Sequence, residues 1–114
     1  MLPQRYRLTK RAELMAVLRH GAMVRGGGLT VRALPTGRQS SRFAFVVSNK
    51  VSKHAVQRNR LRRQLRELVR ARLPKVAGGY DVVVTVQPGR PVRTTAALEE
   101  SLDIALRRVR LLPL

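Results

Sequence analysis

Acidic residues are scarce in this chain of 114 residues. It holds 24 lysines and arginines against 6 aspartates and glutamates, which gives a formal net charge of +18 at pH 7. A charge of this size destabilises the compact state by self-repulsion and attracts polyanions over long range. The expected partner is therefore a nucleic acid, with an anionic membrane surface as the second candidate.

Cysteine is absent, which excludes disulfides, thiolate nucleophiles and cysteine-based metal sites. No apolar run approaches the ~20 residues that cross a bilayer, and the basic N-terminus lacks the apolar core and cleavage site of a secretory signal. We therefore expect a cytoplasmic protein. Hydrophobic residues make up 44% of the chain, which is enough for a core, and the length suits one RNA-binding domain over residues 1–114.

Hydrophobic spacing and turn residues predict three helices and four strands. In chain order they are a helix over 9–20, strands around 23–24, over 29–34 and over 42–48, a helix over 52–73, a strand over 80–87 and a helix over 95–111. Ser52 is the expected N-cap of the long helix, and Pro74 follows its end. The order α-β-β-β-α-β-α predicts an α+β fold, a single-domain sandwich of helices on a sheet.

The helix over 52–73 concentrates like charge in the stretch RNRLRRQLRE, residues 58–67. At ~100° per residue, its core side holds Leu61, Leu65, Leu68 and Val69, and its opposite side holds Asn59, Arg62, Arg63, Arg66 and Arg70. A solvated helix normally alternates charges of both signs at i,i+4 spacing, but Glu67 is the only acid here. Because the planar guanidinium suits phosphate oxygens, we interpret the basic side as a polyanion-binding surface.

The acids and histidines show no pattern of a catalytic or metal site. Glu99 and Glu100 project in different directions from a helix, and His20 and His54 lack a ligand partner at metal spacing. The glycines at 26–28 lack the Gly-Lys-Ser/Thr ending of a phosphate-binding loop. The sequence therefore predicts neither catalytic residues nor metal ligands in the protein itself.

The segment VVSNKVSKHAVQRNRLRRQLRELVR resembles the signature of the protein subunit of bacterial ribonuclease P. Its matching parts are Val46-Val47-Ser48, Lys50-Val51, Arg58-Asn59-Arg60, Arg62-Arg63 and Arg66-Glu67. The opening helix and the order of elements also resemble the family. The chain departs from the family in its aromatic content of 4% and in Leu14, which stands near a usual aromatic. Since aromatic rings stack on bases, single-strand binding here is expected to depend more on arginine.

The resemblance implies a small mixed sheet with three helices and a left-handed β-α-β crossover around the basic helix, against the general right-handed rule. It also implies that the basic helix contacts the catalytic RNA and that a cleft between this helix and the sheet holds the 5′ leader of precursor tRNA. The residues expected to bind RNA are Lys50, Lys53, Arg58, Asn59, Arg60, Arg62, Arg63, Arg66 and Arg70. Those expected in the leader cleft are Arg7, Phe43 and Phe45.

The implied activity is that of a subunit of an RNA-based endoribonuclease, which removes the 5′ leader from precursor tRNA. The RNA would perform the hydrolysis and hold the Mg²⁺, and neither a membrane nor a protein oligomer is required. Two alternatives stay open from the residues alone. One is a structural RNA-binding protein of the ribosomal type without a role in cleavage. The other is a membrane-surface protein, which would need an amphipathic helix that is not part of the core.

Overall fold

The computed structural model describes residues 2–89 and 94–113. Its helices and strands are, in chain order, α1 (Arg11–His20), β1 (Ala22–Gly26), β2 (Leu29–Pro35), β3 (Arg42–Val46), α2 (Ala55–Arg72), β4 (Tyr80–Val86) and α3 (Thr95–Arg108). Short 3-10 turns occur at Gln4–Tyr6 and Leu73–Lys75. This order confirms the predicted α+β fold.

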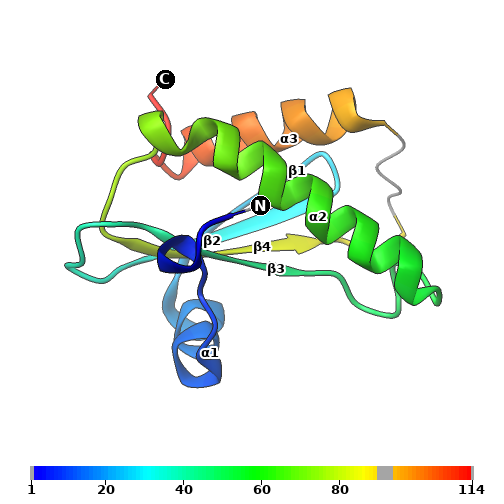
Figure 1. Cartoon of the computed structure of the whole chain (residues 1–114), viewed down its shortest axis with the longest axis horizontal. Helices are drawn as coiled ribbons and strands as arrows, with labels where there is room; N and C mark the ends of the chain where they lie inside the picture. The colour runs from blue at the N-terminus through cyan, green and yellow to red at the C-terminus, as the bar shows by residue number, and fades with distance from the viewer. Residues whose placement is uncertain (1, 90–93, 114) are drawn as a thin grey trace.

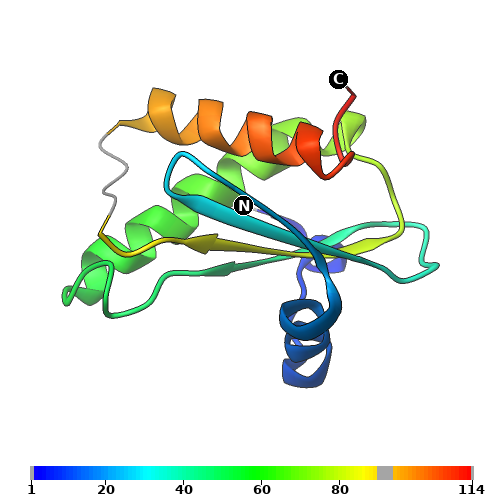
Figure 2. The ribbon, with the colours of Figure 1, turned by 180° about the vertical axis from the view of Figure 1, so that it is seen from behind.

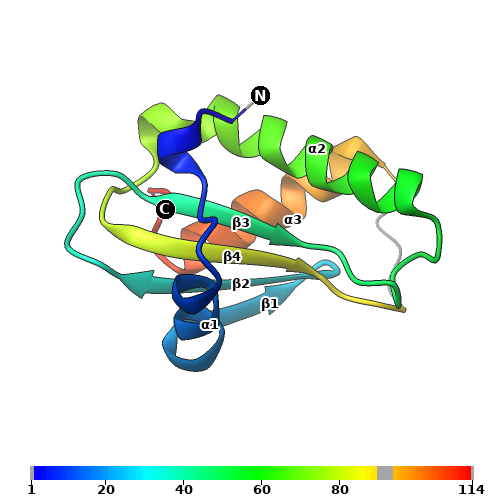
Figure 3. The ribbon, with the colours of Figure 1, turned by 60° about the horizontal axis from the view of Figure 1, so that its bottom comes forward.

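The four strands form one mixed sheet in the order β1-β2-β4-β3. β1 pairs with β2 and β2 with β4 in antiparallel fashion, whereas β3 and β4 are parallel and are connected through α2. Figure 3 shows the sheet from the side of α1, with β3 above β4 and both strands pointing to the right. Seen from the opposite side, where α2 and α3 lie (Figure 1), and with both strands turned to point up, β4 lies to the left of β3. The crossover is therefore left-handed, which is an exception to the strong right-handed preference.

The helices lie on both faces of the sheet. α2 and α3 cover one face, with α3 over β1 and β2 (Figure 2), whereas α1 lies on the opposite face (Figure 3). The main core fills the space between the sheet and α2 and α3, and its largest buried side chains include Phe43, Leu29, Leu65, Leu98, Leu102 and Leu106. A smaller cluster under α1 contains Leu8, Val17 and Val83. None of the described helices is long and apolar enough to cross a membrane.

Several element ends differ from the prediction. Ser52 is not the N-cap of α2, because the helix begins at Ala55 after His54, and no side chain caps it. The Ser52 hydroxyl instead accepts the backbone N–H of His54 at 3.2 Å and donates to Gln57 at 2.6 Å, so it stabilises the preceding turn. β3 ends at Val46 rather than at residue 48, since Val47 has left the ladder with β4.

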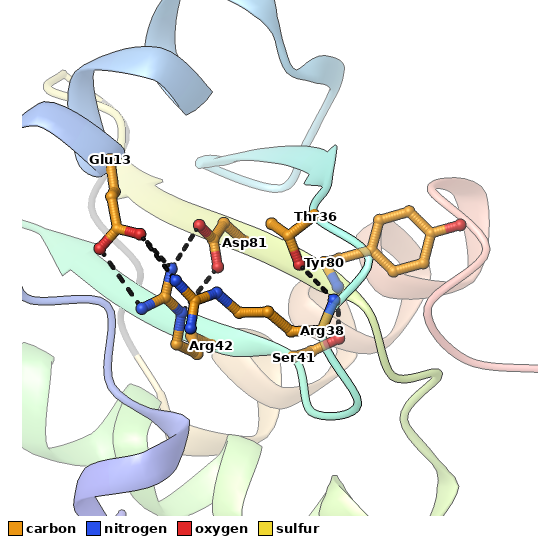
Figure 4. Close-up of polar contacts among 7 residues, drawn as sticks. All are labelled: Glu13, Thr36, Arg38, Ser41, Arg42, Tyr80 and Asp81. Carbon is orange, nitrogen blue, oxygen red and sulfur yellow. Dashed lines mark hydrogen bonds and ion pairs between the residues drawn. The ribbon is translucent and has the colours of Figure 1, made fainter.

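Arg42 connects α1 to the sheet (Figure 4). Its guanidinium donates to both carboxylate oxygens of Asp81 on β4, at 2.9 and 2.8 Å, and to Glu13 on α1 at 2.8 Å. Arg38 adds a more exposed bond to Glu13 at 3.2 Å. The bonds to Asp81 and Glu13 raise the pKa of Arg42, and the bond from Arg42 lowers the pKa of Glu13. Because the side chains of Arg42 and Asp81 are only 14% and 6% exposed, each needs the other as a partner.

Arg72 likewise connects two elements, the helices α2 and α3 on the other face of the sheet. It pairs with Asp103 of α3 and donates to Glu99 at 2.7 Å. The bond from Arg72 holds the pKa of Asp103 below its usual value. The C-terminal end of α2 is thereby attached to α3. The sequence did not predict this pairing, because Arg72 and Asp103 lie 31 residues apart.

Replacing Arg42 is expected to destabilise the fold strongly. Arg42→Met leaves the buried carboxylate of Asp81 without a partner, which should lower the free energy of unfolding by about 3 kcal/mol in urea titrations. Arg38→Met is the matched control, since Arg38 has a 54% exposed side chain and its loss should cost about 0.5 kcal/mol or less. If both variants lose the same free energy of unfolding, the buried pair of Arg42 and Asp81 stabilises the fold no more than the exposed bond of Arg38 does.

Candidate nucleic-acid interface

The outward side of α2 carries the predicted basic surface. Leu65 and Val69 are fully buried and Leu61 and Leu68 pack against the core, so the predicted apolar side of the helix is confirmed. The exposed residues of the predicted RNA-binding set are Lys50, Lys53, Asn59, Arg60, Arg63, Arg66 and Arg70. Figure 1 shows α2 in the outer helix layer, along the length of the sheet. The fold therefore presents these side chains together on one surface.

The exposed cations differ in how far they are neutralised. Arg70 pairs with Glu67 at 2.9 Å, one helical turn away. Within residues 2–89 and 94–113, no acidic side chain lies within ion-pair distance of Arg60, Arg63 or Arg66. These three arginines are the exposed charges of the helix that no acid compensates, and they are available to an external anion.

Two further arginines of the predicted set are half-buried and hold the loop before α2. Arg58 donates to the carbonyl of Ser52 at 2.9 Å, and Arg62 donates to the carbonyl of Val47 at 3.4 Å. Both bonds attach residues 47–52 to the helix. This structural role was not predicted, because it depends on where the loop folds back on α2.

Arg62 also orients the side chain of Asn59. Its Nη2 atom donates to Oδ1 of Asn59 at 2.5 Å. Because arginine has no acceptor, only the oxygen of the amide can face it. The amide nitrogen of Asn59, with its two N–H donors, is therefore directed away from Arg62 on the exposed surface. Asn59 is thus arranged to donate hydrogen bonds to a ligand rather than to accept them.

The predicted leader cleft between α2 and the sheet is mostly filled by core side chains. Phe43 is 2% exposed and stacks on Phe45 with ring centroids 6.5 Å apart. The side chain of Phe43 is therefore covered by its neighbours in this structure, and its place in a leader cleft stays a prediction. Arg7 and Phe45 are half-buried, and Arg7 donates to the carbonyl of Leu2 at 2.7 Å. The three residues do not line an open groove together.

A hollow of about 390 Å³ lies at the N-terminal end of α2. Its lining combines polar side chains with the edge of the core and consists of Val51, Ser52, Gln57, Arg60, Leu61, Gln64, Val86, Thr94, Thr95 and Leu98. Arg60 is the one residue of the predicted RNA-binding set in this lining. The predicted cleft therefore has an open part at this end of the helix.

Among the described residues, all the acidic side chains except that of Glu100 are bonded to arginines. The pairs are Glu13 and Asp81 with Arg42, Glu67 with Arg70, and Glu99 and Asp103 with Arg72. No group of three or more side chains able to hold a metal ion occurs in the described parts of the chain. Oxygens of these carboxylates are thus engaged by guanidinium groups.

Known proteins match the chain over almost its whole length. A family model described as ribonuclease P matches residues 2–110. The chain is 41% identical over 92 residues to the ribonuclease P protein component of Microcystis aeruginosa, with 77% of each protein covered. It is 36% identical over 109 residues to that of Chloroflexus aurantiacus, with 95% of this chain and 80% of the relative covered.

Solved structures show the same fold. The Staphylococcus aureus RNase P protein superposes with a TM-score of 0.85 at 23% identity, covering 94% of this chain and 97% of the other. The Thermotoga maritima RNase P protein gives a TM-score of 0.78 at 24% identity, covering 89% and 96%. The family match and the sequence relatives decide the assignment, and the common fold agrees with it. The chain belongs to the ribonuclease P protein family.

Proposed function

We propose that this protein is the RNA-binding subunit of a cytoplasmic ribonuclease P and assists a catalytic RNA in removing the 5′ leader from precursor tRNA. The observation that carries the proposal is the set of uncompensated arginines, Arg60, Arg63 and Arg66, on the outward side of α2. In a chain of this family, phosphate groups of RNA are the anions that these side chains suit.

The rigidity of α2 supports this role. The helix is packed on the sheet through Leu65 and Val69, and the loop before it is held by Arg58 and Arg62. Side chains on a rigid element lose less freedom when they bind than side chains on a mobile loop. The cationic surface is thus arranged before RNA arrives.

The leader would contact the protein at the open end of the α2–sheet interface. Arg60, Gln57 and Gln64 line the hollow there, and their charged and amide groups suit a sugar-phosphate backbone. The catalytic RNA would perform the phosphodiester hydrolysis and hold the Mg²⁺. The protein would supply positive charge and position through the exposed arginines of α2.

Reconstitution tests the proposed function directly. The purified protein, added to a bacterial ribonuclease P RNA at physiological Mg²⁺, should stimulate removal of the 5′ leader from precursor tRNA. Protein freed of RNA should cleave nothing. Stimulated cleavage distinguishes this function from that of an RNA-binding protein with a purely structural role. Cleavage by RNA-free protein, or tight RNA binding without any effect on cleavage, would contradict the proposal.

Salt dependence measures the number of phosphate contacts. Each contact should lower log K for RNA by about 0.7–0.9 per unit of log salt, so roughly five contacts give a slope near −4. Filter-binding titrations between low and physiological salt provide the slope. The double variant Arg63→Gln with Arg66→Gln should make the slope less steep by about 1.5. A slope of the unmodified protein shallower than about −1 would exclude the electrostatic interface.

Asn59→Ala should separate RNA binding from folding. The change removes the exposed bond from Arg62 but places a better helix former in α2, a gain of up to ~0.7 kcal/mol, so the melting temperature should stay equal or rise slightly. Loss of the outward amide donors should weaken RNA binding roughly fivefold. Thermal melts and binding titrations on one preparation test both effects. A lower melting temperature with unchanged affinity per folded molecule would show that Asn59 is structural.

A further inference from the structure

α3 ends at an arginine with left-handed backbone conformation. Arg110 has φ 66°, the only positive φ at a non-glycine residue in the described ranges. The N–H of Leu111 bonds to the carbonyl of Leu106 at 2.8 Å, and that of Arg110 bonds to Arg107 at 3.0 Å. These two bonds define a Schellman motif, in which glycine is usual at the left-handed position because a Cβ atom is crowded there. The chain thus carries a large side chain where glycine would be less strained.

The Arg110 side chain does not stabilise the helix end through contacts of its own. Within residues 2–89 and 94–113 it makes no hydrogen bond or ion pair, and the residue is exposed. The apolar contact that accompanies such a motif is supplied by Leu106 and Leu111, which are 0% and 1% exposed. Arg107 and Arg108 already place positive charge in the last turn, where the helix dipole favours it. The fold therefore does not explain the arginine at position 110.

Arg110 belongs to a group of exposed cations that we name the C-terminal basic cluster. Its members are Lys75, Arg107, Arg108 and Arg110. The C-terminal ends of α2 and α3 lie at the same end of the molecule (Figures 1 and 2). Lys75 borders two hollows of about 430 and 480 Å³ there, one lined also by Arg107 and the other by Arg110. The nearby acids Glu99 and Asp103 share one arginine, Arg72, and Asp103 also lines the first hollow with Lys75 and Arg107. They offset part of the cluster's charge, whereas Arg108 and Arg110 have no acidic partner among the described residues.

This cluster lies far from the start of the basic helix. α2 has 18 residues, which corresponds to about 27 Å at 1.5 Å per residue. Exposed Arg63 and Arg66 on α2 extend the positive surface from the region of Arg60 toward the cluster, whereas Glu67 offsets the charge of Arg70. A polyanion that follows α2 would therefore contact both ends of the helix. A short or flexible anion would not contact both.

We propose that the C-terminal basic cluster is a second contact surface for the phosphate backbone of the catalytic RNA, and that Arg110 makes part of this contact from its strained conformation. The proposal rests on the proposed function, because it takes the RNA bound by α2 as its ligand. An RNA with many helices can bring a second backbone segment to this end of the protein. The cluster contributes affinity and salt dependence, and it has no part in chemistry.

Arg110→Gly provides the test, with a bacterial ribonuclease P RNA as the probe. Relief of the left-handed strain should raise the melting temperature by roughly 4 °C. Loss of a phosphate contact should weaken RNA binding roughly fivefold and make the salt slope shallower by about 0.7–0.9. Arg110→Lys keeps the charge and the Cβ atom, so its melting temperature and affinity should stay close to those of the unmodified protein.

Two controls make the outcomes distinguishable. Arg19→Gln removes one charge from an exposed position on α1, on the opposite face of the sheet, and should change affinity less than about twofold. Arg63→Gln reports on the α2 surface. If Arg110→Gly binds RNA like Arg19→Gln while Arg63→Gln binds weakly, the second surface is wrong and the proposed function stands. If neither Arg110→Gly nor Arg63→Gln affects binding, both proposals fail. A lower melting temperature of Arg110→Gly would show a structural role and overturn the inference.

Discussion

The rest of the structure depends on the packing of the apolar side of α2 against β3 and α3. Leu65 and Val69 are fully buried in this interface, and burial of each such side chain contributes roughly 1.5–3 kcal/mol. Repulsion between neighbouring cations on the outer side costs only a few tenths of a kcal/mol per pair. The interface can therefore hold a helix whose charge is left uncompensated for a partner.

Glu13, Asp81 and Asp103, half of the six acids of the chain, lie where layers meet. Glu13 and Asp81 neutralise Arg42 between α1 and the sheet, and Asp103 neutralises Arg72 between α2 and α3. These positions are partly shielded from water, where an unpaired charge is most costly. The arginines on the outward surface of α2 receive little of this compensation. The division separates cations that stabilise the fold from cations that are available to RNA.

Local order on the basic surface comes from arginines that face inward. Arg58 and Arg62 donate hydrogen bonds to loop carbonyls, and Arg62 also donates one to the amide oxygen of Asn59. Side chains that the sequence presents as equivalent positive charges therefore have two roles. Some hold the backbone and orient neighbours, while Arg63 and Arg66 extend into solvent. This arrangement explains how a surface of like charges can also have defined hydrogen-bonding geometry.

Periodicity in the sequence was sufficient to predict the elements, the buried side of α2 and the exposed positions of Arg63 and Arg66, because these depend on residues within a few helical turns. The resemblance of 46–70 to a known signature added the family and the left-handed crossover. Sequence reasoning placed Phe43 in the leader cleft but did not show that its side chain is covered, and it missed the pairing of Arg42 with Asp81, 39 residues apart. Only the tertiary structure decided these points. Burial and long-range ion pairs depend on which segments the fold brings together, and local spacing carries no information about that.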